Sequence, residues 1–137
     1  FEYAKKYNGV YSWQDSIEGD IKVLGDAFSL KLALRNIIDN AIKYSPQGSM
    51  IEVSLNINEL GHVQVKVADQ GVGIKDEEKE LVFKKFFRSG NEMNRSTKGT
   101  GLGLYLVKEI VLNHDGNVEV LNNKPQGTIF KINLLPS

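Results

Sequence analysis

The chain has 137 residues, of which 41% are hydrophobic and 25% are charged, as is ordinary for one soluble globular domain with a single core. Its 17 Lys and Arg residues balance 17 Asp and Glu residues, so it lacks the overall basic charge of a nucleic-acid-binding protein. The absence of Cys excludes disulfides, thiolate metal sites and a cysteine nucleophile, and it fits a reducing cytosol. The sequence has no signal peptide and no apolar run long enough to cross a membrane.

The N-terminal part of the chain predicts a connection followed by short strands. Because the chain begins at Phe1 without Met, we expect a fragment of a longer protein, and a membrane segment upstream stays open. Residues 1–9 predict a linker stub from a preceding domain. Residues 10–17 and 21–24 predict short strands around a turn at residues 18–20.

Residues 26–44 predict one amphipathic helix, around which the rest of the chain is arranged. Asp26 is a typical N-cap residue. Pro46 disfavours helical angles at Ser45, so the helix is expected to end near Tyr44. Apolar residues recur on one side at helical spacing, namely Leu30, Leu34, Ile37, Ile38, Ala41 and Ile42.

The opposite side of this helix carries Asn36, Asn40 and Lys43, one turn apart, with Asp39 and Tyr44 beside them. Asn is a poor helix former, so two Asn residues at this spacing favour a polar cleft over bulk solvent. An amide oxygen suits Mg²⁺, and a Lys ammonium suits phosphate. On this helix alone, a solvated face that happens to carry two Asn residues is an equal alternative.

Two strands with alternating apolar residues follow, at residues 51–57 and 63–68, and their short link predicts an antiparallel hairpin. The second strand runs into Asp69-Gln70-Gly71-Val72-Gly73. A carboxylate at this place can accept a hydrogen bond from an exocyclic amino group, and each Gly lets a flat ring approach the backbone. Alone, this stretch is more often an ordinary Asp-x-Gly turn.

Residues 76–87 predict a short helical piece, and residues 88–100 predict a mobile loop or lid with little apolar content. Positive residues exceed negative ones between positions 84 and 98, which suits either a polyphosphate or a solvated loop. The positive residues are Lys84, Lys85, Arg88, Arg95 and Lys98.

The cluster Gly99-x-Gly101-x-Gly103 opens a predicted helix that runs to about Asn113. Unpaired N–H groups and the helix dipole make such a place an anion site, although flexible Gly residues also suit a plain hinge. Strands are expected at residues 117–121 and 128–134, around a turn. The whole order predicts an α+β two-layer sandwich: a mixed, mostly antiparallel sheet of about five strands packed against about three helices.

Taken together, these clusters resemble the ATP-binding catalytic domain of bacterial sensor histidine kinases. Its wider superfamily includes DNA gyrase, mismatch-repair clamps and a class of heat-shock chaperones, and it implies the Bergerat ATP-binding fold over residues 10–137. The resemblance covers about residues 18–134. The matching motifs, in the order N, G1, F and G2 boxes, are Asn36-x3-Asn40-x2-Lys43-Tyr44, Asp69-x-Gly71-x-Gly73, Phe83 with Phe86-Phe87-Arg88, and Gly99-Thr100-Gly101-Leu102-Gly103-Leu104. Gly127-Thr128-Ile129-Phe130 is similar to the closing glycine motif.

The resemblance implies a role for each matching residue. Asn40 is expected to bind Mg²⁺, with Asn36 beside it, and Asp69 is expected to bind the adenine amino group. Asn36, Asn40 and Arg88 are the expected catalytic residues. The full expected set around ATP is Asn36, Asn40, Lys43, Tyr44, Asp69, Gly71, Gly73, Ile74, Phe83, Arg88, Lys98, Gly99, Thr100, Gly101, Leu102, Gly103, Leu104 and Thr128.

One departure from the wider superfamily is informative. ATP-hydrolysing relatives carry a Glu one helical turn before the metal Asn, and here that position is Asn36. We therefore expect slow hydrolysis and transfer of the γ-phosphoryl group to another acceptor. In the family the acceptor is a His on a separate upstream domain, so His62 and His114 are expected to be structural.

The resemblance therefore implies a protein histidine kinase domain of a two-component system, with ATP and Mg²⁺ as cofactors. Its implied partners are its own upstream dimerisation domain, in a homodimeric parent protein, and a response regulator. No nucleic acid and no direct membrane contact are expected. The implied location is the cytoplasm, including the cytoplasmic part of a membrane-bound sensor. The alternatives are an anti-sigma-factor serine kinase of the same superfamily and a nucleotide-operated binding module.

Overall fold

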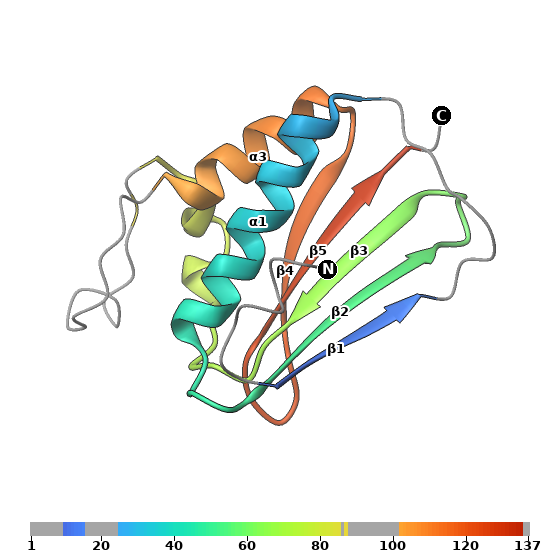
Figure 1. Ribbon diagram of the computed structural model, residues 1–137. Coiled ribbons are helices and arrows are strands. Elements are labelled where there is room, and N and C mark those ends of the chain that lie inside the picture. The colour runs from blue at the N-terminus through green and yellow to red at the C-terminus, as the bar shows by residue number, and fades with distance from the viewer. Residues whose placement is uncertain (1–9, 16–24, 86, 88–101, 136–137) are drawn as a thin grey trace.

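The computed structural model describes residues 10–15, 25–85, 87 and 102–135 of the chain. Within these ranges the structure has two layers, a five-stranded sheet and a helical layer that covers one of its faces (Figure 1). The α-helices are α1 (Ala27–Tyr44) and α3 (Gly103–Asn113), and two 3-10 turns are η2 (Asp76–Glu78) and η3 (Leu81–Phe83). The strands are β1 (Val10–Asp15), β2 (Met50–Ile57), β3 (Val63–Ala68), β4 (Asn117–Asn122) and β5 (Thr128–Leu134).

Helix α1 begins and ends where the local sequence predicts. The Asp26 carboxylate accepts hydrogen bonds from the Phe28 N–H at 3.2 Å and from the Ser29 hydroxyl at 2.6 Å, which satisfies donors of the first turn. At the other end Ser45 is extended, with φ −95° and ψ 148°, because Pro46 follows it. The predicted helix at residues 26–44 is confirmed.

The sheet has the strand order β1-β2-β3-β5-β4. Strands β1 and β2 are parallel and the other neighbouring pairs are antiparallel, so the predicted mixed, mostly antiparallel sheet is confirmed. The first predicted strand, at residues 10–17, is present as β1 over Val10–Asp15, and residues 16 and 17 lie outside the described residues. The strand predicted at residues 21–24 lies outside the described residues.

The core lies between the helices and the covered face of the sheet. Alternate residues of β2, β3 and β5 point into it, and α1 and α3 contribute their apolar sides. The largest side chains that are fully buried there are Phe130, Ile37, Ile38, Ile51, Val67, Val107 and Val111. None of the helices in the described ranges combines the length and apolar composition that a membrane crossing requires.

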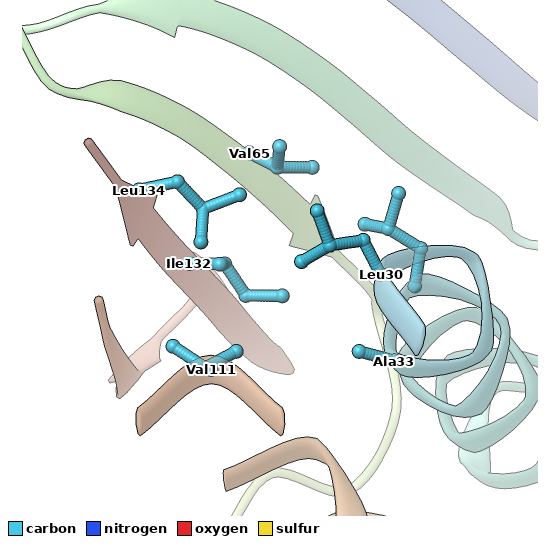
Figure 2. A pocket seen from close by; sticks show the side chains of 7 residues that line it. Leu30, Ala33, Val65, Val111, Ile132 and Leu134 are labelled. Carbon is cyan, nitrogen blue, oxygen red and sulfur yellow. The ribbon is translucent and has the colours of Figure 1, made fainter. Parts of the chain in front are cut away.

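The two helices run in opposite directions, which decides what meets at each end of the molecule. The N–H of Asp26, before α1, donates to Nε2 of His114, after α3, at 3.0 Å, while Gly103 at the start of α3 faces Asn36 of α1. Near the first of these ends, a cavity of about 30 Å³ lies between the helices and the sheet (Figure 2). Its lining is wholly apolar and consists of Leu30, Ala33, Leu34, Val65, Val111, Ile132 and Leu134. The candidate site lies at the other end.

The segment at residues 76–87 was predicted to be a short helical piece. Within the described residues of this segment the structure has two separate 3-10 turns, and neither has a side-chain cap. Phe83 anchors the segment: it is 7% exposed, and its ring packs edge-on against Phe130, with ring centroids 6.2 Å apart. Among the described residues the helical layer therefore holds two α-helices and two turns, where about three helices were expected.

Candidate active site

Asp69 follows β3 directly and is 3% exposed. Its Oδ1 accepts hydrogen bonds from the N–H of Gly71 at 2.9 Å and from the N–H of Thr128 at 3.1 Å. Both of these bonds go to Oδ1, and within the described part of the chain no donor bonds to Oδ2. Burial raises the pKa of Asp69, and the two N–H groups offset part of this effect. The site thus holds a buried carboxylate with one oxygen left for a ligand that donates a hydrogen bond.

Glycine is needed next to this carboxylate for two reasons. At Gly71 a Cβ would lie 2.4 Å from the carbonyl oxygen of Tyr44, so the end of α1 and the turn after β3 are in contact. Gly73 has a φ of +79°, which a residue with a side chain rarely adopts. The predicted Asp-x-Gly-x-Gly element is therefore a turn pressed against the end of α1.

The polar side of α1 faces the start of α3. A Cβ at Gly103 would have Cγ of Asn36 as its nearest neighbour, at 3.9 Å. Asn36, Asn40, Lys43 and Tyr44 are all half-buried, which fits the edge of a cleft better than a fully solvated face. The Lys43 nitrogen lies 5.2 Å from the centre of the Tyr44 ring, so this side chain is positioned near the same edge.

The first turn of α3 has no side-chain cap among the described residues. The backbone N–H groups at the start of a helix have no partner within it, and the helix dipole adds partial positive charge there. The start of α3 therefore offers Asn36 on one side and N–H donors on the other. Such a place suits the phosphates of a nucleotide.

Of the other predicted site residues, some lie beside Asp69, some lie against or within the core, and some lie outside the described residues. Thr128 is 5% exposed; its carbonyl oxygen accepts from the Asp69 N–H, and its own N–H donates to Oδ1 of Asp69. Ile74 and Leu104 are partly buried against the core, and Phe83 lies within it. Leu102 lies immediately before α3. Arg88, Lys98, Gly99, Thr100 and Gly101 lie outside the described residues, so their roles and the lid at residues 88–100 stay predictions.

The donor set limits how a metal ion could be held. The described ranges contain no group of three or more His, Cys, Asp or Glu residues that could hold a metal. The amide oxygens of Asn36 and Asn40 are hard, neutral ligands, which suit Mg²⁺ but are too few to complete its coordination. These residues fit a metal that is bound jointly by the protein and by the phosphates of a ligand.

Two residues of the site were missed by sequence reasoning. Asn123 and Gln126 lie in the turn between β4 and β5, and their side-chain amides donate to the carbonyl oxygens of Asp69 and Gly71 at 2.7 and 2.8 Å. Residues 122–127 read only as a turn. The one available signal was two amide side chains just before the Gly127-Thr128 motif.

Comparison with known proteins gives the family of this two-layer domain. Residues 25–137 match the family described as histidine kinase-, DNA gyrase B- and HSP90-like ATPase. The chain belongs to this family.

Individual relatives are sensor kinases. The chain is 40% identical over 115 residues to the sensor-like histidine kinase SenX3 of Mycobacterium tuberculosis, which covers 84% of the chain and 28% of that protein. It is 43% identical over 107 residues to the histidine-protein kinase/phosphatase MprB of Mycolicibacterium vanbaalenii, with coverages of 78% and 22%. The chain therefore spans less than a third of these relatives.

Solved structures agree with the fold. A mycobacterial sensor histidine kinase MprB superposes with a TM-score of 0.85 at 37% identity, covering 94% of the chain and 84% of that structure. The catalytic domain of histidine kinase ThkA gives a TM-score of 0.79 at 29% identity, with coverages of 98% and 84%. The predicted fold class and the predicted family are confirmed.

Proposed function

We propose that this chain is the ATP- and Mg²⁺-binding catalytic domain of a two-component sensor histidine kinase. It would transfer the γ-phosphoryl group of ATP to a His on a separate dimerisation domain, and a response regulator would receive the group afterwards. The observation that carries the proposal is the buried Asp69 carboxylate, with Oδ2 left for a ligand. It lies at the same end of the molecule as Asn36 and the start of α3, where the backbone N–H groups of the first helical turn lie.

Each part of this site suits one part of the nucleotide. Oδ2 of Asp69 can accept a hydrogen bond from the adenine amino group, while the N–H groups at the start of α3 can bind phosphate oxygens. Asn40, with Asn36, would hold Mg²⁺ jointly with those phosphates, and Lys43 adds positive charge. When bound, Mg²⁺ supplies the charge that neutralises the phosphoryl group during transfer.

The same residues argue against rapid hydrolysis. A neutral Asn36 amide cannot take a proton from water, whereas a Glu at this position could. Phosphoryl transfer depends mainly on positioning and charge neutralisation. A site with these groups but no base is therefore suited to hand the phosphoryl group to an acceptor that another domain supplies.

Phosphate chemistry in the full-length protein tests the proposal. Incubation with γ-labelled ATP and Mg²⁺ should give protein-bound label that is labile in acid and stable in alkali, as phosphohistidine is. Acid-stable phosphoserine on a separate protein would instead support the anti-sigma-factor kinase. Nucleotide binding without any transfer would support the binding module, and brisk hydrolysis by the isolated domain would contradict the role assigned to Asn36.

Asn40→Ala tests the metal assignment separately. If Asn40 holds Mg²⁺, the substitution weakens ATP binding much more in Mg²⁺ than in EDTA, because only the metal-bound complex loses a ligand. Lys31→Ala is a matched control, since Lys31 is an exposed residue of the same helix. Equal weakening of ATP binding in both buffers would contradict the assignment.

A further inference from the structure

We propose that Asn123 and Gln126, in the turn between β4 and β5, are positioning residues that set the preference of the site for adenine over guanine. This inference rests on the proposed function, because the group that their turn would help to select is the base of the bound nucleotide. Neither side chain is expected to touch the nucleotide. Both would act through the backbone at residues 69–71.

Two side-chain hydrogen bonds, together called the bracket below, hold the turn that contains Asp69. Nδ2 of Asn123 donates to the carbonyl oxygen of Asp69 at 2.7 Å, and Nε2 of Gln126 donates to the carbonyl oxygen of Gly71 at 2.8 Å. Asn123 is 54 positions from Asp69 in the sequence, and Gln126 is 55 positions from Gly71. The two amides therefore hold both ends of the three-residue segment that presents the carboxylate.

The bracket is itself held in a defined shape. Oδ1 of Asn123 accepts from the N–H of Lys124 at 2.8 Å, and the Asn123 N–H donates to the carbonyl oxygen of Gly127 at 3.0 Å. The Asn123 side chain thus has its oxygen in its own turn and its amino group on the neighbouring turn. Because both ends are bonded, the side chain cannot rotate without breaking a hydrogen bond.

The backbone of the two turns is also in direct contact. Gly127 has a φ of +120°, and a Cβ there would lie 1.9 Å from the carbonyl oxygen of Asp69. The next residue, Thr128, exchanges two hydrogen bonds with Asp69, one of them to its Oδ1. The β4–β5 turn therefore fixes the position of the Asp69 main chain and the direction of its carboxylate.

A fixed carboxylate oxygen discriminates between bases. Adenine offers an amino donor where guanine offers a carbonyl oxygen, so an oxygen that cannot move away favours adenine and repels guanine. When the bracket is weakened, Asp69 can adjust to either base. Adenine binding should then fall while guanine binding stays the same or rises, whereas a general loss of structure would weaken both.

The test uses Gln126→Met, which keeps the length of the side chain but removes the donor. Gln126 is exposed, so the variant is expected to fold normally. Lys124→Met is the matched control in the same turn, and Asn123→Ala is a second, independent variant. Binding of ADP and GDP is measured by titration calorimetry. Hydrogen exchange at the Gly71 and Thr128 amides is measured without nucleotide.

We expect Gln126→Met to bind ADP up to about fivefold more weakly, the effect of losing the one hydrogen bond between the loosened Asp69 carboxylate and adenine, with no loss for GDP. Exchange at the Gly71 and Thr128 amides should be faster than in Lys124→Met. The inference is overturned if these amides exchange at the control rate, or if the ratio of ADP to GDP affinity equals that of the control. If the unmodified protein binds neither nucleotide, the proposed function itself fails, while the exchange result still reports on the bracket.

Discussion

Replacing Asp69 with Asn would separate the stability of the fold from recognition of the nucleotide. The amide oxygen of Asn can still accept from the N–H groups of Gly71 and Thr128, as Oδ1 of Asp69 does at 2.9 and 3.1 Å. The other oxygen becomes an NH₂ group. The substitution therefore preserves the internal hydrogen bonds and changes only the atom that is left for a ligand.

The effect on stability follows from the direction of the pKa shift. Burial raises the pKa of Asp69 above the unfolded value of 3.8, so its favourable contribution is complete below 3.8 and is lost as the pH rises through the folded-state pKa. At neutral pH the wild-type protein therefore bears the cost of a buried charge. Asp69→Asn should have an equal or higher melting temperature at neutral pH, and the difference should shrink as the pH is lowered.

The effect on binding has the opposite sign. An NH₂ group facing the adenine amino group places donor against donor, and a buried mismatch of this kind costs about 1–3 kcal/mol. Since each 1.4 kcal/mol is about tenfold in affinity, ADP should bind roughly five- to 150-fold more weakly. Calorimetric titration with ADP at neutral pH measures this loss, and thermal unfolding at several pH values measures the change in stability.

Asp76→Asn is the matched control. Asp76 is exposed, and a hydrogen bond from Lys79 at 2.6 Å holds the pKa of this carboxyl below its usual value. Its contribution to stability is therefore present above the unfolded pKa and is lost as the pH falls through the folded-state pKa, opposite to Asp69. ADP binding should not change. Unaltered ADP affinity in Asp69→Asn would contradict the pairing of Oδ2 with the adenine amino group. A large loss of its stability at neutral pH would contradict the cost assigned to the buried charge.

Three further substitutions probe the packing around the site and at the far end. Gly127→Ala should destabilise the domain by at least about 2 kcal/mol in urea unfolding, because φ is +120° and the new Cβ would lie 1.9 Å from the carbonyl oxygen of Asp69. His114→Phe should cost about 2 kcal/mol, since the ring is kept but two hydrogen bonds are lost, from the Asp26 N–H to Nε2 and between Nδ1 and the Ile110 carbonyl oxygen. Val111→Ile should stabilise the domain by up to about 0.8 kcal/mol, because one added methyl group enters the cavity of about 30 Å³.

Each of these has a control in the same chain. Gly48 also has a positive φ, of +84°, but a Cβ there would meet nothing within 4 Å, so Gly48→Ala measures backbone strain alone. His62 lies in a hairpin turn, and His62→Phe should leave the α1–α3 contact unchanged. Leu112→Ile alters a neighbour of Val111 that is 51% exposed. A control that matches its test variant would contradict the corresponding explanation.

Elements with strong local signals were predictable from the sequence. An N-cap Asp26 and a helix-ending Pro46 define the bounds of α1 whatever the rest of the chain does. The β2–β3 hairpin follows from alternation and a short link. The parallel pairing of β1 with β2 was less accessible, because nothing within residues 10–15 specifies a partner 40 residues later.

In the candidate site too, features with a local sequence signal were predictable and features that depend on contacts between distant segments were not. The amide of Asn36 and the carboxylate of Asp69 each indicated a ligand-binding role from the residue type alone. The approach of Gly103 to Asn36, however, depends on the antiparallel arrangement of the two helices. Local patterns cannot show this. Phe83 was expected at the nucleotide and lies in the core against Phe130, because an aromatic residue in an apolar cluster does not reveal which side it faces.

The β4–β5 turn shows why the remaining part could not be found in the sequence. An amide in a turn can bond its own backbone, solvent or a distant segment, and Asn123 makes the first and the third of these contacts. Only the position of β5 between β3 and β4 brings its turn against Asp69. Residues that touch a ligand must have particular chemistry and leave a local pattern, whereas residues that position them need only a donor in the right place. Positioning residues such as Asn123 can therefore be identified only when the arrangement of the strands is known.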